Sequence, residues 1–239
     1  MPKELFSKPL FSYDGLRGGG GRKGDDEFSE TVVGYAEGAI QNMRGRAIPL
    51  VRQLTPFINQ GIYHLIVSDD VKGHVPAQLL HLVIYSMYYS SGFPHIDLVH
   101  IRGRGRTIKE EMVSAFQDQA GILDILGQKI LLVTESIGSG KTISRFGQAF
   151  RALDIPYDIA SFVVSEKEER YRRWGQIGED VRLFHPDMPD GSEEFVDQCQ
   201  LMSAAFYPER SFNDFEMAIG RYTQTRLPTV AKEVLAEVI

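Results

Sequence analysis

The chain contains a single cysteine, Cys199, and no apolar run near the roughly 20 residues that a membrane span requires. One cysteine cannot form an internal disulfide or build a four-cysteine zinc site. Residues 1–28 also lack an apolar stretch of signal-peptide length. We therefore expect neither an integral membrane protein nor a disulfide-built secreted domain, but a protein of the reducing cytoplasm.

Positive charge is scarce as well. Lysine and arginine total 26 against 32 aspartates and glutamates, which gives a formal net charge of −6. Surfaces that bind nucleic acid broadly are usually basic, so we expect no general DNA- or RNA-binding surface. Some basic residues are nevertheless clustered, because Arg102, Arg104 and Arg106 alternate with glycines. This cluster is compatible with a local anion site.

The hydrophobic pattern divides the chain into three regions. Residues 1–28 have the composition of an irregular, glycine-rich leader, with a glycine-rich loop closing over a phosphate as the alternative. Residues 29–189 carry the main pattern of apolar runs. Residues 190–239 show only helical periodicity, which predicts a helical cap or a region that contacts a partner protein or a second copy.

Within residues 29–189, strand-like apolar runs alternate with helix-like segments. This alternation predicts an α/β fold with an open parallel sheet, a Rossmann-like core flanked by helices. The predicted strands are 62–68, 96–101, 129–135 and 158–165, with a short edge strand at 180–186. The predicted helices are 29–54, 75–89, 108–119 and 141–153.

The loop after the third predicted strand is the most informative one, because ligands of open parallel sheets bind at the carboxyl ends of the strands. The loop ends in Gly140-Lys141-Thr142, as a P-loop does. Glu135, however, occupies the position of the first P-loop glycine, where a carboxylate would intrude on the amides that cradle a phosphate. The small residues before a helix N-terminus still predict a phosphate loop, of another kind.

Residues 130–142 resemble the phosphoribosyl diphosphate (PRPP) motif of the type I phosphoribosyltransferases. An apolar strand is followed by Thr134 and Glu135, where the family usually has two acidic residues, and Gly138 stands where it often has a small residue or aspartate. The resemblance implies that Thr134 and Glu135 contact the ribose hydroxyls and that Glu135 stabilises positive charge on the sugar. It also implies a set of ligands for the 5′-phosphate: Gly138, Ser139, Gly140, Lys141 and Thr142.

Two further loops fit the same resemblance. Lys72 and Gly73 follow the first strand, where family members grip pyrophosphate, and Asp69 and Asp70 beside them are candidate ligands for Mg²⁺. The arginine cluster follows the second strand, where the family has a loop that closes over PRPP. Three guanidiniums among glycines suit the neutralisation of a departing diphosphate, and we assign Arg104 a catalytic role there beside Arg102 and Arg106.

The implied function is transfer of a phosphoribosyl group from PRPP, with Mg²⁺, to an unknown acceptor with release of pyrophosphate. The acceptor would lie under a hood formed by the N-terminal helix or by the helices after Pro189. The family is commonly dimeric, so a homo-oligomer is expected. Two other functions stay open: a non-catalytic sensor of PRPP or a nucleotide, and a scaffold subunit that binds a protein or nucleoprotein complex through residues 190–239.

We interpret Cys199 and most histidines as packing residues, whereas His74 falls within a predicted ligand loop.

Overall fold

The computed structural model describes residues 23–101, 128–164, 177–187, 192–207 and 210–239. Its strands form one parallel sheet in the order β2-β1-β3-β4-β5. These strands are β1 (Tyr63–Asp69), β2 (Asp97–Ile101), β3 (Lys129–Thr134), β4 (Tyr157–Ser161) and β5 (Leu183–Phe184). The helices are α1 (Lys23–Ile58), α2 (Asp70–Ser91), α5 (Lys141–Ala152), α7 (Ser192–Met202) and α8 (Asp214–Val238), with the 3-10 helix η3 (Ala204–Phe206). The predicted α/β architecture, an open parallel sheet flanked by helices, is confirmed.

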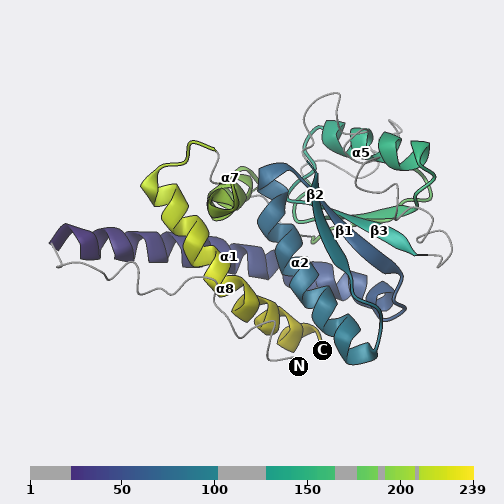
Figure 1. The fold of residues 1–239 in the computed structure, drawn as a ribbon, viewed down its shortest axis with the longest axis horizontal. Helices are drawn as coiled ribbons and strands as arrows, with labels where there is room; N and C mark the ends of the chain where they lie inside the picture. Colours follow the sequence, from purple (N-terminus) through teal and green to yellow (C-terminus); the bar gives the residue numbers. More distant parts are fainter. Residues whose placement is uncertain (1–22, 102–127, 165–176, 188–191, 208–209) are drawn as a thin grey trace.

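Both faces of the sheet are covered. Successive side chains of β1 and β3 alternate between two hydrophobic clusters, because residues of a strand point to opposite faces in turn. Ile66 and Val133 join the cluster that contains α1, α2, α7 and α8, whereas Val67 and Leu132 join the cluster under α5. Figure 1 shows α5 on one side of the strands and α1, α2 and α8 on the other. Burial on both faces explains why the strands read as almost continuous apolar runs.

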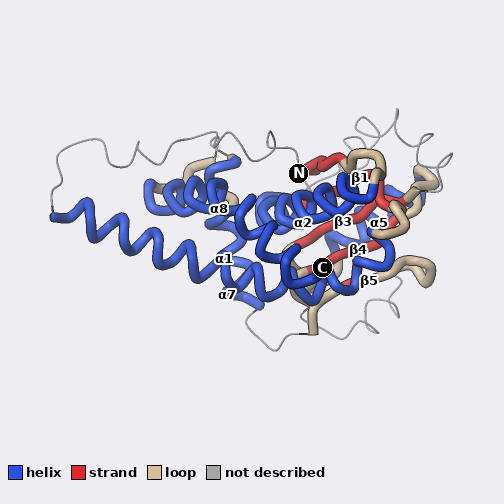
Figure 2. Tube along the Cα trace, turned by 90° about the horizontal axis from the view of Figure 1, so that it is seen from below, coloured by secondary structure: helices blue, strands red, loops and turns tan. Residues whose placement is uncertain are grey.

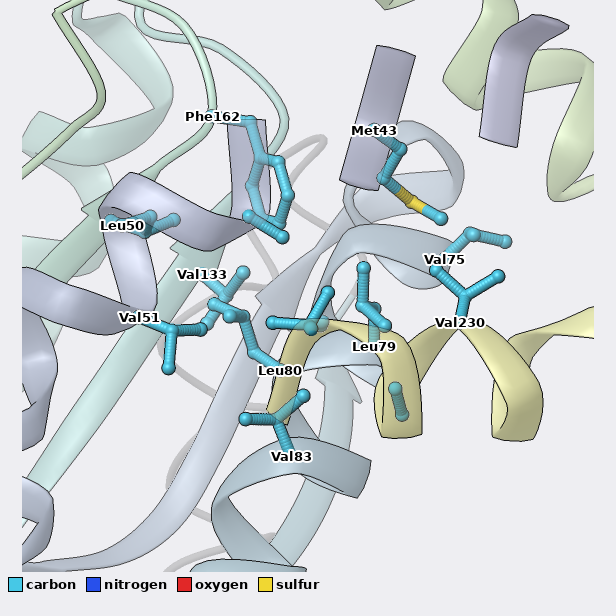
Figure 3. Packing of buried hydrophobic residues seen from close by; sticks show 14 of the residues in the cluster. Met43, Leu50, Val51, Val75, Leu79, Leu80, Val83, Val133, Phe162 and Val230 are labelled. Carbon is cyan, nitrogen blue, oxygen red and sulfur yellow. The ribbon is translucent and has the colours of Figure 1, made fainter. Parts of the chain in front are cut away.

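The larger helical layer is held together by α1 and α8, which run past the sheet in Figure 2. Val230 of α8 packs among Met43 of α1 and Val75 and Leu79 of α2, as Figure 3 shows. At the surface of the same contact, Arg44 of α1 pairs with two glutamates of α8. The buried side chains of α8 therefore belong to the same cluster as those of the strands.

The boundaries of two helices differ from the sequence prediction. Helix α1 begins at Lys23, inside the segment predicted as an irregular leader. Helix α2 begins directly after β1, so the loop predicted between the strand at 62–68 and the helix at 75–89 is wrong, since residues 71–74 lie in the first turns of α2. Val71, Val75 and Leu79 are all buried, and their spacing of four residues extends the apolar face of α2 back to the strand. The helix predicted at 108–119 lies outside the described residues.

A buried carboxylate fixes the amino ends of the strands. Asp158 of β4 has no exposed surface and accepts a hydrogen bond from the Tyr63 hydroxyl of β1 at 3.0 Å. Lys129 of β3 lies 3.2 Å from the same carboxylate, and Arg182, just before β5, lies 3.4 Å from it. Because these partners satisfy Asp158 at the end of the sheet opposite the predicted site, we assign it a structural role.

Candidate functional site

The strand order indicates that a ligand would bind at the carboxyl edge of the sheet. In a doubly wound sheet of order 2-1-3-4-5, the connections after β1 and β3 leave toward opposite faces, and ligands bind where they diverge. Here α2 follows β1 onto one face and α5 follows β3 onto the other. Ser68 pairs with Val133 in the β1–β3 register, so Asp69 and Thr134 close the two strands at the same level.

The segment after β3 is anchored at both ends of its first turn. The buried Thr134 hydroxyl donates either to a Glu135 carboxylate oxygen at 3.2 Å or to the Ser136 carbonyl at 3.1 Å. The amide of Ile137 donates to the carbonyl of Val163 at 2.9 Å, which ties the loop to the chain beyond β4. These contacts hold the half-buried Glu135 carboxylate at the end of β3.

The loop then delivers the chain to the amino end of α5. Gly140, the N-cap, has a φ of 71°, a left-handed conformation that glycine adopts without steric strain. No side chain among the described residues caps this helix. Lys141 and Ser139 are exposed and Thr142 is half-buried. First-turn amides without a side-chain cap, together with the helix dipole, favour an anion at this position.

The other predicted site residues are placed only in part. Lys72 lies in the first turn of α2, half-buried, with its Nζ 3.7 Å from Asp197 of α7, and Gly73 follows it. Asp69 and Asp70 join β1 to α2, but their side chains lie outside the described part of the structure. The residues Arg102, Arg104 and Arg106 also lie outside it, directly after the end of β2. In the described residues, no group of three or more metal-ligating side chains comes together.

Sequence reasoning missed one charged residue beside this edge, Arg46 of α1. Only 5% of Arg46 is exposed, and its guanidinium lies 4.8 Å from the centre of the Phe195 ring of α7. Burial raises the pKa of the neighbouring Cys199 thiol, which also feels the charges of Glu135, Arg46 and Lys72. Four elements therefore bring these groups together: α1, α2, α7 and the end of β3. The sequence signal was an arginine within the apolar stripe of α1, three residues after Met43.

A second polar cluster, of histidines, lies beneath the first turns of α2. His74 stacks on His100 of β2, with ring centres 3.7 Å apart, and its Nδ1 lies 3.0 Å from the Tyr207 hydroxyl. The Ser68 hydroxyl lies 2.7 Å from Nδ1 of His100. Burial lowers the pKa of His74 to about 3 and that of His100 to about 4. Both rings are thus neutral at neutral pH, and they join β1, β2 and α2 to the segment after η3.

The fold is that of an α/β protein with a parallel sheet, and the candidate site lies at the carboxyl ends of its strands. Comparison with known proteins adds no closer relationship, because no family model, no curated protein and no solved structure matches this chain. Of the helices that the structure describes, none combines the length and the apolar character needed to span a membrane.

Proposed function

We propose that this protein binds PRPP at the carboxyl edge of its sheet and transfers the phosphoribosyl group to an acceptor, as a divergent phosphoribosyltransferase. The observation that carries the proposal is the connection from β3 to α5. A buried strand leads through Glu135 and a left-handed Gly140 to a helix N-terminus without a side-chain cap, next to the point where α2 and α5 diverge. A terminal phosphate fits such an end, and a carboxylate one loop earlier fits a ribose.

Each part of the site has a distinct task in this proposal. The amides at the start of α5 and the hydroxyls of Ser139 and Thr142 bind the 5′-phosphate. Glu135 accepts hydrogen bonds from the ribose hydroxyls and stabilises positive charge on the sugar as the bond from its C1 carbon to pyrophosphate breaks. Lys72 and the arginines of the cluster Arg102, Arg104 and Arg106 neutralise the departing diphosphate.

Mg²⁺ enters the proposal together with the diphosphate. The donor set suits it, since Asp69 and Asp70 carry carboxylates at the junction of β1 and α2, and Mg²⁺ prefers a few carboxylate ligands with phosphate oxygens and water. When bound, the ion supplies positive charge to the leaving group. The protein's own residues hold the ribose still and orient it toward the acceptor.

One observation favours a second candidate, a non-catalytic sensor of PRPP or a nucleotide. Thr134 is fully buried and its hydroxyl bonds within its own loop, so Glu135 is the acidic side chain that this position offers to a ribose. Type I phosphoribosyltransferases usually have two. A sensor would bind PRPP by the same contacts without releasing pyrophosphate.

The test combines binding with turnover. Thermal melting is measured with PRPP and Mg²⁺, with ATP and inorganic phosphate as controls, because a ligand of the folded state raises the melting temperature. We expect a shift with PRPP that is lost in Glu135→Gln but kept in the exposed control Glu193→Gln of α7. Pyrophosphate release with candidate acceptors then separates a transferase from a sensor. No shift with PRPP in the wild type would refute both.

A further inference from the structure

Arg46 is a buried cation without an acidic partner among the described residues. Its exposed fraction is 5%, and its Nε donates a hydrogen bond to Oδ1 of Asn42 at 3.1 Å. The ion pairs of the described residues involve Arg44, Arg182 and Arg226 but not Arg46. Among the described residues, its polar and ring contacts are one amide oxygen and the face of one aromatic ring, Phe195.

Such an arrangement is costly in the free protein. A guanidinium stays protonated in proteins, and moving it out of water costs several kcal/mol unless a counter-charge compensates. The Phe195 ring offsets part of this desolvation cost, since a cation over an aromatic face is stabilised by about 1–2 kcal/mol. No acidic side chain of the described residues compensates the remainder, which makes Arg46 a candidate to bind an anionic ligand.

The existing contacts define which anion fits. Phe195 covers one face of the guanidinium and Asn42 takes its Nε, so the edge formed by the two terminal nitrogens remains for a ligand. That edge matches the two oxygens of a carboxylate. A single positive charge balances a carboxylate but not a phosphate dianion, so the charge of Arg46 favours a monoanion.

The position of Arg46 connects it with the candidate site. Cys199, four residues after Phe195 on α7, lies within electrostatic reach of both Arg46 and Glu135. Phe195 stacks on Phe162, which follows β4 at the carboxyl edge of the sheet. Phe162 and Met43, which lies three residues before Arg46, belong to the same hydrophobic cluster, and Figure 3 labels both.

We propose that Arg46 is a specificity-determining residue that binds the carboxylate of a small monoanionic ligand between α1, α7 and the end of β3. The assignment of this ligand as the acceptor of the phosphoribosyl group rests on the proposed function. The anion site itself rests on the contacts of Arg46 alone.

The experiment uses benzoate as the probe and its uncharged amide, benzamide, as the control ligand. Thermal melting of the full chain is measured with each, alone and with PRPP and Mg²⁺ present. Arg46→Met keeps much of the side-chain volume without the charge, and Arg46→Lys keeps the charge without the paired nitrogens. Arg44→Met removes a guanidinium from the same helix that already has glutamate partners, which makes it the matched control.

We expect benzoate, but not benzamide, to raise the melting temperature of the wild type. Arg46→Met should weaken benzoate binding by about 10- to 100-fold, the loss of a charged hydrogen-bonded pair, and Arg46→Lys should weaken it less. Without ligand, Arg46→Met should melt at or above the wild type, because it removes an uncompensated buried charge. Arg44→Met should melt lower and keep the response to benzoate.

Two results would overturn the proposal: no preference for benzoate over benzamide in the wild type, or a benzoate response that survives in Arg46→Met. If Arg46→Met does not fold, Arg46→Lys decides, since unchanged benzoate affinity in that variant also contradicts binding by the paired nitrogens. The PRPP measurement keeps the two proposals apart. A benzoate response that depends on Arg46, without a response to PRPP, would refute the transferase and leave the anion site standing.

Discussion

Acidification should unfold this protein through the stacked pair His74 and His100. In the folded state their pKa values are about 3 and about 4, whereas an unfolded histidine titrates near 6.5. Because both folded values lie below the unfolded one, protons bind preferentially to the unfolded chain. The stability that the neutral pair contributes is complete above about pH 6.5 and is lost as the pH falls toward 4 and then 3. Burial lowers the pKa of His81 too, which acts in the same direction.

The size of the effect follows from these values. Between pH 7 and pH 5, each of the two histidines should reduce the free energy of unfolding by about 2 kcal/mol, and the pair by about 4 kcal/mol. Domains of this kind have a total stability of roughly 5–15 kcal/mol, so the loss is a large share. The cluster joins β1 and β2 to α2 and to Tyr207, so its protonation should separate the segment after η3 from the sheet first.

Urea unfolding followed by far-UV circular dichroism at pH 7, 6 and 5 measures this loss. The double variant His74→Phe with His100→Asn removes both titrating rings. Its free energy of unfolding should therefore fall much less between pH 7 and pH 5 than that of the wild type. His95→Gln, an exposed histidine stacked on Tyr85, is the matched control and should behave as the wild type. The reasoning fails if the wild type is equally stable at pH 7 and 5, or if the double variant is as acid-sensitive as the wild type.

Three further predictions test the packing and the phosphate loop. Asp158→Asn should lower the free energy of unfolding in urea by about 2 kcal/mol, because its partly exposed cationic partners lose their carboxylate; no change would contradict its role at the amino end of the sheet. Gly220→Ala should lower the free energy of unfolding by about 1–3 kcal/mol, since the new Cβ would lie 2.5 Å from the backbone nitrogen of Ala205. Gly38→Ala, whose Cβ would have nothing within 4 Å, should raise it by about 0.5–1 kcal/mol. Melting temperatures of the two variants that move in the same direction would refute this pair of predictions. Gly140→Ala should weaken PRPP binding in a titration, because a left-handed alanine is strained by about 1 kcal/mol, and unchanged affinity would argue against this loop as the phosphate site.

The alternation of apolar runs was sufficient to predict the parallel sheet. Strands buried on both faces are almost entirely apolar, so runs such as 129–135 stand out, and even the edge strand at 180–186 is present as β5. The start of α2 was not predictable in the same way. Gly73 and the charges of Asp69, Asp70 and Lys72 favour a turn locally, and the buried spacing from Val71 onward outweighs them only in the folded packing.

The site was predictable where it follows from chain order and not where it depends on packing between distant elements. Glu135 and Gly140 lie in one short loop after a strand, so the sequence alone predicts that they are close in space. Arg46 and Phe195 are far apart in sequence and meet only because α7 folds back onto α1. The local pattern showed Arg46 only as an arginine within the apolar stripe of α1, and it could not show which distant side chain would contact its guanidinium.

The packing of α8 along α1 has a consequence for synthesis on the ribosome. The apolar side of α1 leaves the ribosome early, yet Val230, Ala231 and Val234, which complete its cover, are made only after the entire sheet. A nascent chain would therefore carry an exposed apolar helix until α8 is synthesised, a situation that invites aggregation or chaperone binding. The last steps of folding should wait for α8, and ribosome-bound chains halted before residue 214 should be protease-sensitive in α1.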